Sequence, residues 1–206
     1  MNTNKNSYII IYSSVMVIIV AFLLAFIYQT LKPMQDVNVA LDKKKQILAS
    51  LNIRDLANQE AETKYQEVVK SETTISDGLS LYDCEVDGKR KYVVPVRGMG
   101  LWGPIWGYVA LDDDKNTIFG AYFNHESETA GLGAEIKDSK AWQDQFRGKK
   151  VFAADGETIA IAVKKKADVK NPESECDAVT GATLTSDGVS LMLQESFAKY
   201  KDFFKK

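Results

Sequence analysis

The segment DAVTGATLTSDG, from Asp177 to Gly188, combines small residues, hydroxyl side chains and glycine directly before an amphipathic C-terminal pattern. In such a segment the backbone N–H groups and the positive end of the helix dipole face whatever lies beside Thr183. That environment favours an anion such as a phosphate. The same residues also suit an ordinary helix start with Thr185 or Ser186 as N-cap. The residues alone therefore permit a phosphate site without requiring one.

Other patterns that could support catalysis are weak. Residues 98–103, GMGLWG, have the spacing of a dinucleotide-binding loop, but Pro104 and a strand-like stretch follow where that motif needs a helix. His125 is the only histidine, so a site with several histidine ligands is excluded and we expect a surface or lining role. We expect no metal site and no catalytic residue. Cys84 and Cys176 are expected to be free or structural, and a disulfide needs the fold to bring them together.

The N-terminal end of the 206-residue chain is almost purely apolar, whereas the remainder has an ordinary soluble composition. Tyr8 to Tyr28 contains no charged residue, and a helix of that length spans about 30 Å of hydrocarbon. We predict a short tail over residues 1–7 and a transmembrane helix over 8–28, flanked by Lys5 and Lys32. A cleaved signal peptide is the alternative, but the apolar run is long and no small-residue cleavage site follows.

Composition and charge exclude several classes of protein. With 45% hydrophobic and 26% charged residues, the chain is not of the disordered type. Its 26 basic and 28 acidic side chains give a formal net charge of −2, without the basic excess of nucleic-acid binders. We predict no nucleic-acid partner. The lysine runs 43–45 and 164–166 are interpreted as solvated faces, the first also able to touch lipid headgroups.

The hydrophobic pattern places the chemistry on a tethered domain. Helical spacing between Asp36 and about Lys70 predicts a juxtamembrane helical stalk over residues 29–70. Alternating patterns predict a mainly antiparallel sheet in one α+β domain over 71–206. The predicted strands are 79–86, 91–96, 108–111, 117–124 and 158–163, with a hairpin turn at Asp87-Gly88. The predicted helices are 140–146 and a C-terminal helix carrying Val189, Met192, Leu193, Phe197, Tyr200, Phe203 and Phe204.

Three segments carry a resemblance to a known family. The run DAVTGATLTSDGV resembles the covalent flavinylation motif of FMN-binding domains in respiratory complexes, whose last threonine is the modified one. GLWGPIWGYVALDDDKNT (100–117) and ESETAGLGAEI (126–136) resemble the C subunits of Na⁺-translocating NADH:quinone reductases. The related G subunits of Rnf-type ferredoxin:NAD oxidoreductases share the flavin motif and are the alternative, although the Leu-Trp-Gly stretch favours the C subunits. A tethered scaffold without flavin is the alternative outside the enzymes.

The resemblance implies specific roles for the residues around Thr183. FMN would be joined through its phosphate to the oxygen of Thr183 by a separate flavin transferase. The phosphate would approach the backbone at Thr180, Gly181 and Ala182 and accept hydrogen bonds from Thr185 and Ser186. Asp177 would serve recognition by the transferase or hold the loop.

The resemblance also implies a second loop against the isoalloxazine ring. Its residues are Glu128, Thr129, Gly131, Leu132 and Gly133, and Ala130 stands where the family usually has proline, which implies a less rigid loop. Trp102 and Trp106 would pack by the flavin, at an interface between subunits or in the core.

At the level of the whole protein, the resemblance implies an electron-relay subunit of a sodium-exporting membrane complex, working with the other subunits and not oxidising NADH alone. It places the flavin domain on the periplasmic side of the bacterial inner membrane. The positions of Lys32 and of lysines 43–45 alone would put the domain in the cytoplasm, but long domains often translocate regardless of such a bias.

Overall fold

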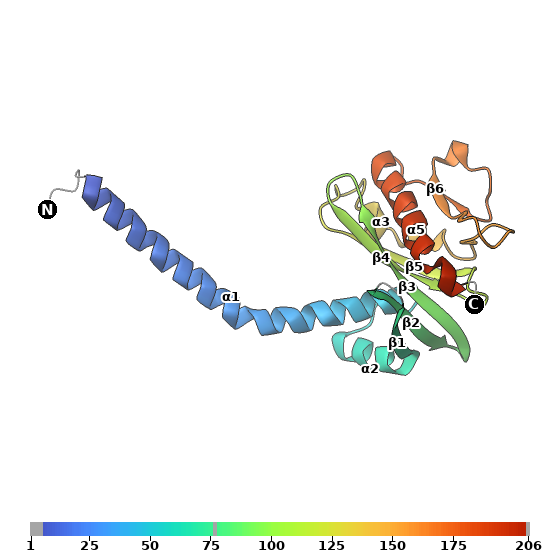
Figure 1. Cartoon of the computed structure of the whole chain (residues 1–206), viewed down its shortest axis with the longest axis horizontal. Coiled ribbons are helices and arrows are strands. Elements are labelled where there is room, and N and C mark those ends of the chain that lie inside the picture. Colours follow the sequence, from blue (N-terminus) through green and yellow to red (C-terminus); the bar gives the residue numbers. More distant parts are fainter. Residues whose placement is uncertain (1–5, 76–77, 205–206) are drawn as a thin grey trace. The chain divides into compact units, whose positions relative to one another are not determined.

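The computed structural model describes residues 6–75 and 78–204 and divides into two compact units, with the boundary between Asp42 and Lys43 (Figure 1). The first unit is the N-terminal part of helix α1 (Asn6–Ser50). Among the described residues, α1 is the one helix long and apolar enough to cross a membrane. Its apolar side chains, such as Ile10, Phe22 and Leu24, are exposed on all sides, as lipid contact requires.

The predicted membrane-spanning segment is therefore helical, and the helix continues without a break through Pro33 into the predicted stalk. Residues 1–5 of the predicted tail lie outside the described residues. The division into a span over 8–28 and a stalk over 29–70 stays a prediction. Within that stalk the structure has the end of α1, residues 51–57 without helix, and α2 (Asn58–Val68).

The end of α1 belongs to the second unit, in which residues 46–51 are buried. The helix stops because Asn52 takes a left-handed conformation with φ +63°. The N–H of Ile53 then donates to the carbonyl of Leu48 over 2.9 Å and that of Asn52 to Ala49 over 3.1 Å, which is a Schellman motif. Asparagine tolerates this conformation better than most residues, so the stop is encoded locally.

A five-stranded antiparallel sheet forms the centre of this unit, in the order β1-β2-β3-β4-β5. The strands are β1 (Val69–Ile75), β2 (Leu79–Val86), β3 (Lys89–Met99), β4 (Pro104–Leu111) and β5 (Ile118–His125). The Asp87-Gly88 hairpin turn has positive φ at both residues, as a two-residue type I′ turn requires. The predicted α+β class with an antiparallel sheet is confirmed, and β1 is a strand that the sequence pattern did not show.

The two faces of the sheet are covered by different elements. On one face α5 (Thr183–Phe204) buries the predicted apolar stripe, including Met192 and Phe197, against β3 (Figure 1). The α1–α2 connection contacts β5, where Asn52 and Arg54 donate to the carbonyls of Phe119 and Ala121. These contacts hold the sheet between α5 and the end of α1.

Two short elements differ from the sequence-based expectation. The strand predicted over 158–163 is wrong over most of its length, because β6 spans only Ala162–Lys164. Asp155 accepts the N–H groups of Glu157 and Thr158 and the Thr158 hydroxyl, so a turn takes up the start of that segment. β6 pairs in parallel with β7 (Glu175–Asp177), which was not predicted. The predicted helix over 140–146 is α4 (Lys140–Asp144), preceded by α3 (Glu135–Asp138).

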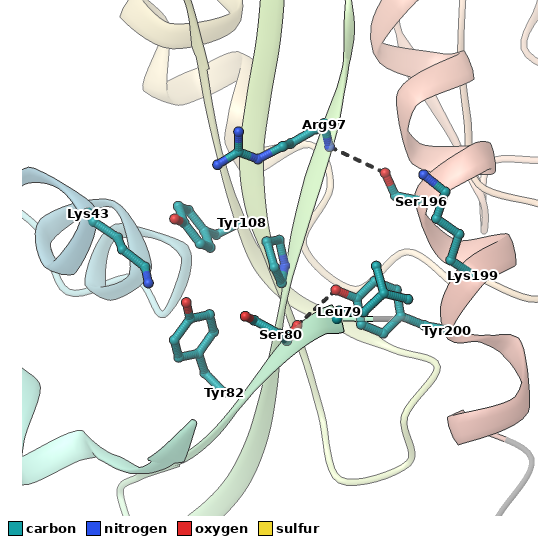
Figure 2. A pocket seen from close by; sticks show the side chains of 11 residues that line it. Lys43, Leu79, Ser80, Tyr82, Arg97, Tyr108, Ser196, Lys199 and Tyr200 are labelled. Carbon is teal, nitrogen blue, oxygen red and sulfur yellow. Dashed lines mark hydrogen bonds between the residues drawn. The ribbon is translucent and has the colours of Figure 1, made fainter. Parts of the chain in front are cut away.

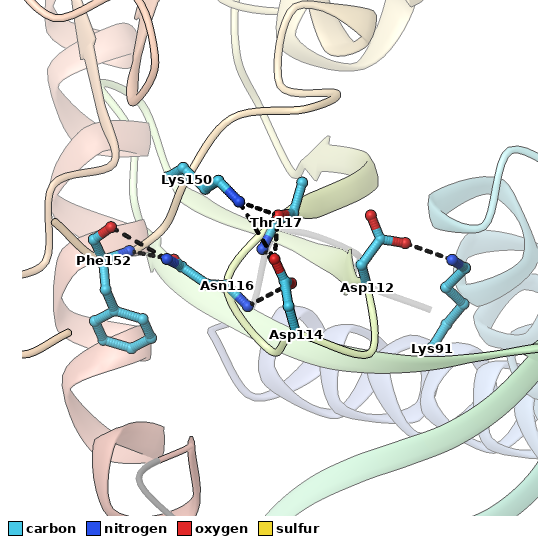
Figure 3. Close-up of polar contacts among 7 residues, drawn as sticks. All are labelled: Lys91, Asp112, Asp114, Asn116, Thr117, Lys150 and Phe152. Carbon is cyan, nitrogen blue, oxygen red and sulfur yellow. Dashed lines mark hydrogen bonds and ion pairs between the residues drawn. The ribbon is translucent and has the colours of Figure 1, made fainter. Parts of the chain in front are cut away.

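The predicted turn between β4 and β5 is held by a polar network (Figure 3). Asp114 accepts the N–H groups of Asn116 and Thr117, the Thr117 hydroxyl and the ammonium of Lys150. Burial alone would raise the pKa of Asp114, but these hydrogen bonds outweigh it and lower the pKa to about 2. Asn116 exchanges two further bonds with the backbone of Phe152, so the network joins the turn to the segment after α4.

Glu175 predicts a pH dependence of stability. It is 8% exposed, accepts the N–H groups of Lys170 and Asn171 and pairs with Lys164. Hydrogen bonding from Asn171 and from Lys164 lowers its pKa from an ordinary 4.5 to about 2. Because the folded pKa is depressed, this stabilisation is present above the unfolded pKa and is lost as pH falls toward the folded one. We expect Glu175→Gln to reduce the loss of unfolding free energy between about pH 6 and about pH 3, measured by denaturant titration. An unchanged pH dependence would contradict the assignment.

Candidate functional site

Thr183 is the first residue of α5 and is half-buried. The turn before it is closed by the N–H of Ala182, which donates to the carbonyl of Val179 over 3.1 Å. Gly181 takes φ +79°, a conformation that L side chains rarely adopt, and a Cβ there would lie 3.0 Å from Cδ2 of Leu132. The tight turn therefore presents Thr183 at the helix start and places Leu132 beside Gly181.

α5 begins three or four residues earlier than expected, so the prediction of Thr185 or Ser186 as N-cap is wrong. Both residues are buried within the first helical turns. The Ser186 oxygen accepts the N–H of Val179 over 3.0 Å, which holds the preceding turn against the helix. The Thr185 hydroxyl donates to Glu128 over 2.6 Å. A hydroxyl has a single hydrogen, so the expected donation from Thr185 to a phosphate does not occur in this arrangement.

Glu128 forms hydrogen bonds to the three segments that make up the site. It is 7% exposed, and its second carboxylate oxygen accepts the N–H of Trp102 over 2.9 Å. Its own N–H donates to Nδ1 of His125 over 3.1 Å, which fixes the loop after β5. One carboxylate thus connects the loop between β3 and β4, the loop after β5 and the first turn of α5.

Two glycines make room for this carboxylate. A Cβ at Gly100 would lie 2.5 Å from one oxygen of Glu128, and a Cβ at Gly133 would lie 2.4 Å from the other. The glycines of the 98–103 segment therefore serve close packing. The segment leads into strand β4 and not into a helix, in agreement with the rejection of a dinucleotide-binding loop.

The loop expected to face the flavin lies beside Thr183 through these contacts. The carbonyl of Thr129 accepts the N–H groups of Leu132 and Ala134, and Gly131 takes φ +72°. Ala130 is exposed, and its predicted effect on loop rigidity stays a prediction. Large apolar side chains on the converging segments are exposed, namely Met99, Leu101, Trp102, Leu132 and Leu184. The site thus has an apolar surface next to a helix N-terminus.

Asp177 and Thr180 line a neighbouring pocket of about 520 Å³ together with Gly131, Trp142 and Lys166 among others. The backbone of Asp177 is fixed on both sides, because its carbonyl accepts Nε1–H of Trp142 over 2.8 Å and its N–H donates to Gln145 over 3.0 Å. The Asp177 carboxylate therefore lies on a segment with a fixed backbone, at the first residue of the motif.

The remaining candidate residues have structural roles. Trp106 donates to Gln46 at the end of α1, away from Thr183. Cys84 and Cys176 are both free and buried, and burial raises the pKa of each thiol to about 12, so neither is a reactive thiolate. Within the described ranges, no cluster of three metal-ligating side chains is present. The role of His125 as an acceptor within the site was not predicted, because a lone histidine carries no local signal.

Comparison with known proteins gives consistent results. Residues 100–198 match the family model of the FMN-binding domain. The chain is 42% identical over 123 residues to the C subunit of the Na(+)-translocating NADH-quinone reductase of Chlamydia trachomatis, a match that covers 53% of this chain and 39% of that protein. It is 40% identical over 147 residues to the corresponding subunit of Neisseria meningitidis, covering 70% and 49%. The chain therefore spans less than half the length of these curated relatives.

Solved structures extend the match over most of the domain. The crystal structure of the C subunit from Parabacteroides distasonis aligns with a TM-score of 0.79 and 37% identity, covering 85% of this chain and 98% of that one. Shewanella oneidensis NqrC aligns with a TM-score of 0.66 at 23% identity, which supports the fold alone. On these findings, the chain belongs to the family of the C subunits of Na⁺-translocating NADH-quinone reductases.

Proposed function

We propose that this chain is the flavin-carrying electron-relay subunit of a membrane-bound, sodium-translocating NADH:quinone reductase, with FMN attached through a phosphoester to Thr183. The observation that carries the proposal is the position of the half-buried Thr183 at the start of a 22-residue helix. The first N–H groups of such a helix have no intrahelical acceptor, and the helix dipole favours an anion there.

The residues present fit FMN. The turn of Thr180, Gly181 and Ala182 brings no large side chain to Thr183, so a phosphate can approach the backbone. Trp102 and Leu132 offer exposed apolar surface for the ring system. Glu128, Gly133 and Thr185 hold these segments in place, and Thr129 and Gly131 shape the loop. We assign Ser186 to holding the turn before Thr183 and Asp177 to recognition by the flavin transferase.

Bound FMN supplies reversible electron transfer. The protein's part is to hold the cofactor permanently, to limit its exposure to water and to keep it at a fixed place beside its partner subunits. The glycines of residues 98–103 lead into a strand, whereas a nicotinamide-binding loop of this pattern leads into a helix. The isolated chain should therefore not oxidise NADH.

A complex assembled with Thr183→Ala tests the relay. We expect membranes containing this variant to lose NADH-dependent quinone reduction by at least about tenfold, a rise of about 1.4 kcal/mol in the activation barrier. Thr180→Ala in the same complex is the control and should retain most of the rate. Equal rates in the wild type and in Thr183→Ala would refute the relay role, provided that immunoblotting shows equal amounts of the chain.

We also propose that α1 anchors the chain in the bacterial inner membrane with the flavin domain in the periplasm, where lipid and other subunits surround the helix. A C-terminal epitope tag tests the orientation. Protease added to intact spheroplasts should remove the tag, and protease added to inverted vesicles should leave it. The reverse pattern would place the domain in the cytoplasm, as the lysine distribution alone suggests.

A further inference from the structure

β2 and β3 separate in the middle of the sheet. Their pairing ends at Tyr82 and Val93, although β2 begins at Leu79 and β3 runs on to Met99. Continued pairing would set Pro95 opposite Ser80, and proline has no N–H to offer the ladder. The separation leaves a pocket of about 340 Å³ between the strands (Figure 2).

Side chains of α5 replace the lost ladder partners. The N–H of Arg97 donates to the Ser196 hydroxyl oxygen over 3.3 Å, and the Tyr200 hydroxyl donates to the carbonyl of Ser80 over 2.8 Å. These two bonds come from successive turns of the same helix and contact both separated strands. The fold therefore supports the opening, because α5 supplies partners to one freed backbone group on each of the two strands.

Among the described residues that line the pocket, positive charge is in excess. Lys43 from α1, Arg97 from β3 and Lys199 from α5 line it. Lys43 lies 3.5 Å from the carboxylate of Glu72, which also accepts the Tyr82 hydroxyl over 2.9 Å. Among the described residues, the charged groups of Arg97 and Lys199 form no ion pair within 4.0 Å. The charge of Lys43 is thus neutralised by Glu72, whereas the charges of Arg97 and Lys199 are not neutralised by a described carboxylate.

The walls combine this charge with aromatic surface. Figure 2 shows Arg97 and Lys43 on the same side of β3 as the rings of Tyr82 and Tyr108, while Tyr200 and Lys199 come from the α5 side. Burial, together with the hydrogen bond to Glu72, raises the pKa of Tyr82 well above its ordinary value, so its hydroxyl stays neutral. The planar guanidinium of arginine suits carboxylate and phosphate oxygens, and tyrosine rings suit an apolar body.

We propose that this pocket binds a small organic anion, a carboxylate or a phosphate ester, whose charged group pairs with Arg97 and whose apolar body packs on the tyrosine rings. Its volume lies within the range of small-molecule sites. None of its lining residues belongs to the site around Thr183, so the proposal does not depend on the flavin.

The test uses the full chain in an uncharged detergent, with ionic strength matched by KCl. The probes are phenyl phosphate, benzoate, inorganic phosphate and neutral benzyl alcohol, titrated by isothermal calorimetry and by amide chemical shifts. We expect saturable binding of both aromatic anions, weaker binding of inorganic phosphate and none of benzyl alcohol. If one aromatic anion binds at least tenfold more tightly than the other, that identifies the head group as carboxylate or phosphate.

Arg97→Gln should weaken the binding of the aromatic anions at least tenfold, because the substitution removes the positive charge and keeps the backbone bond to Ser196. The exposed Lys89, at the other end of β3, gives the matched control, and Lys89→Gln should bind as the wild type does. No saturable binding to the wild type would overturn the proposal. Equal affinities in Arg97→Gln and Lys89→Gln would overturn it as well, because the anion would then bind elsewhere.

Discussion

Thr183→Ala, produced in cells with an active flavin transferase, is expected to carry no covalent flavin and to keep the fold of the wild type. The substitution removes the side-chain oxygen at the first position of α5, to which the phosphate is proposed to be attached. Alanine is a good helix former, and Thr183 is only half-buried, so the stability cost is below about 1 kcal/mol. Intact mass and flavin fluorescence in a denaturing gel measure the attachment, and denaturant unfolding measures stability.

Two variants separate the chemistry of Thr183 from its place in the loop. Thr183→Ser keeps a hydroxyl on the Cβ of residue 183 and should be flavinylated. Thr180→Ala leaves Thr183 intact and should retain at least part of the flavin, since Thr180 is exposed. Covalent flavin on Thr183→Ala would falsify the assignment. Complete loss of flavin from Thr180→Ala, with flavin kept in Thr183→Ala, would move the attachment to Thr180.

Glu128→Ala should have the largest effect on stability. Truncation leaves the buried Thr185 hydroxyl and the part-buried Trp102 N–H without their acceptor, and it opens a cavity between three segments. Each orphaned donor costs about 1 to 3 kcal/mol. We expect the free energy of unfolding to fall by about 3 kcal/mol and the flavinylated fraction to fall with it, because the Trp102 and Leu132 segments lose their shared anchor.

A double-mutant cycle isolates the Glu128–Thr185 contact. Thr185→Val removes the hydroxyl with little change of shape, and the two single variants should be non-additive by about 1 kcal/mol or more. Glu128→Gln keeps an acceptor and should cost less than Glu128→Ala. A loss below about 0.5 kcal/mol in Glu128→Ala, with normal flavin attachment, would show that the carboxylate does not hold the site.

The sequence predicted those parts of the fold that are determined by residues close together in the chain. The C-terminal helix follows from the spacing of Val189, Met192 and Phe197, and all three are buried. The β2–β3 hairpin follows from Asp87-Gly88, whose backbone takes the required conformation. The motif around Thr183 could be located in the sequence because glycine, hydroxyls and a helix start are adjacent in the chain.

Features that depend on distant residues could not be predicted. Strands β6 and β7 are three residues each, too short for an alternating pattern, and each is defined by its partner. The sequence did not predict that the carboxylate of Glu128 bonds to Trp102 and Thr185, 26 and 57 residues away. Its expected contact with the flavin stays a prediction. The opening between β2 and β3 depends on Pro95 together with Ser196 and Tyr200 on α5. Only the folded chain brings these groups together.

The intact mass of the wild-type chain, purified from cells that contain a flavin transferase and then mapped by peptide sequencing, tests the central claim most directly. The covalent attachment proposed at Thr183 predicts a gain of one FMN less one water on the peptide that contains Thr183. An unmodified mass, with the transferase shown to be active on another substrate, would contradict the claim. The segment before α5 would then be only the start of a helix.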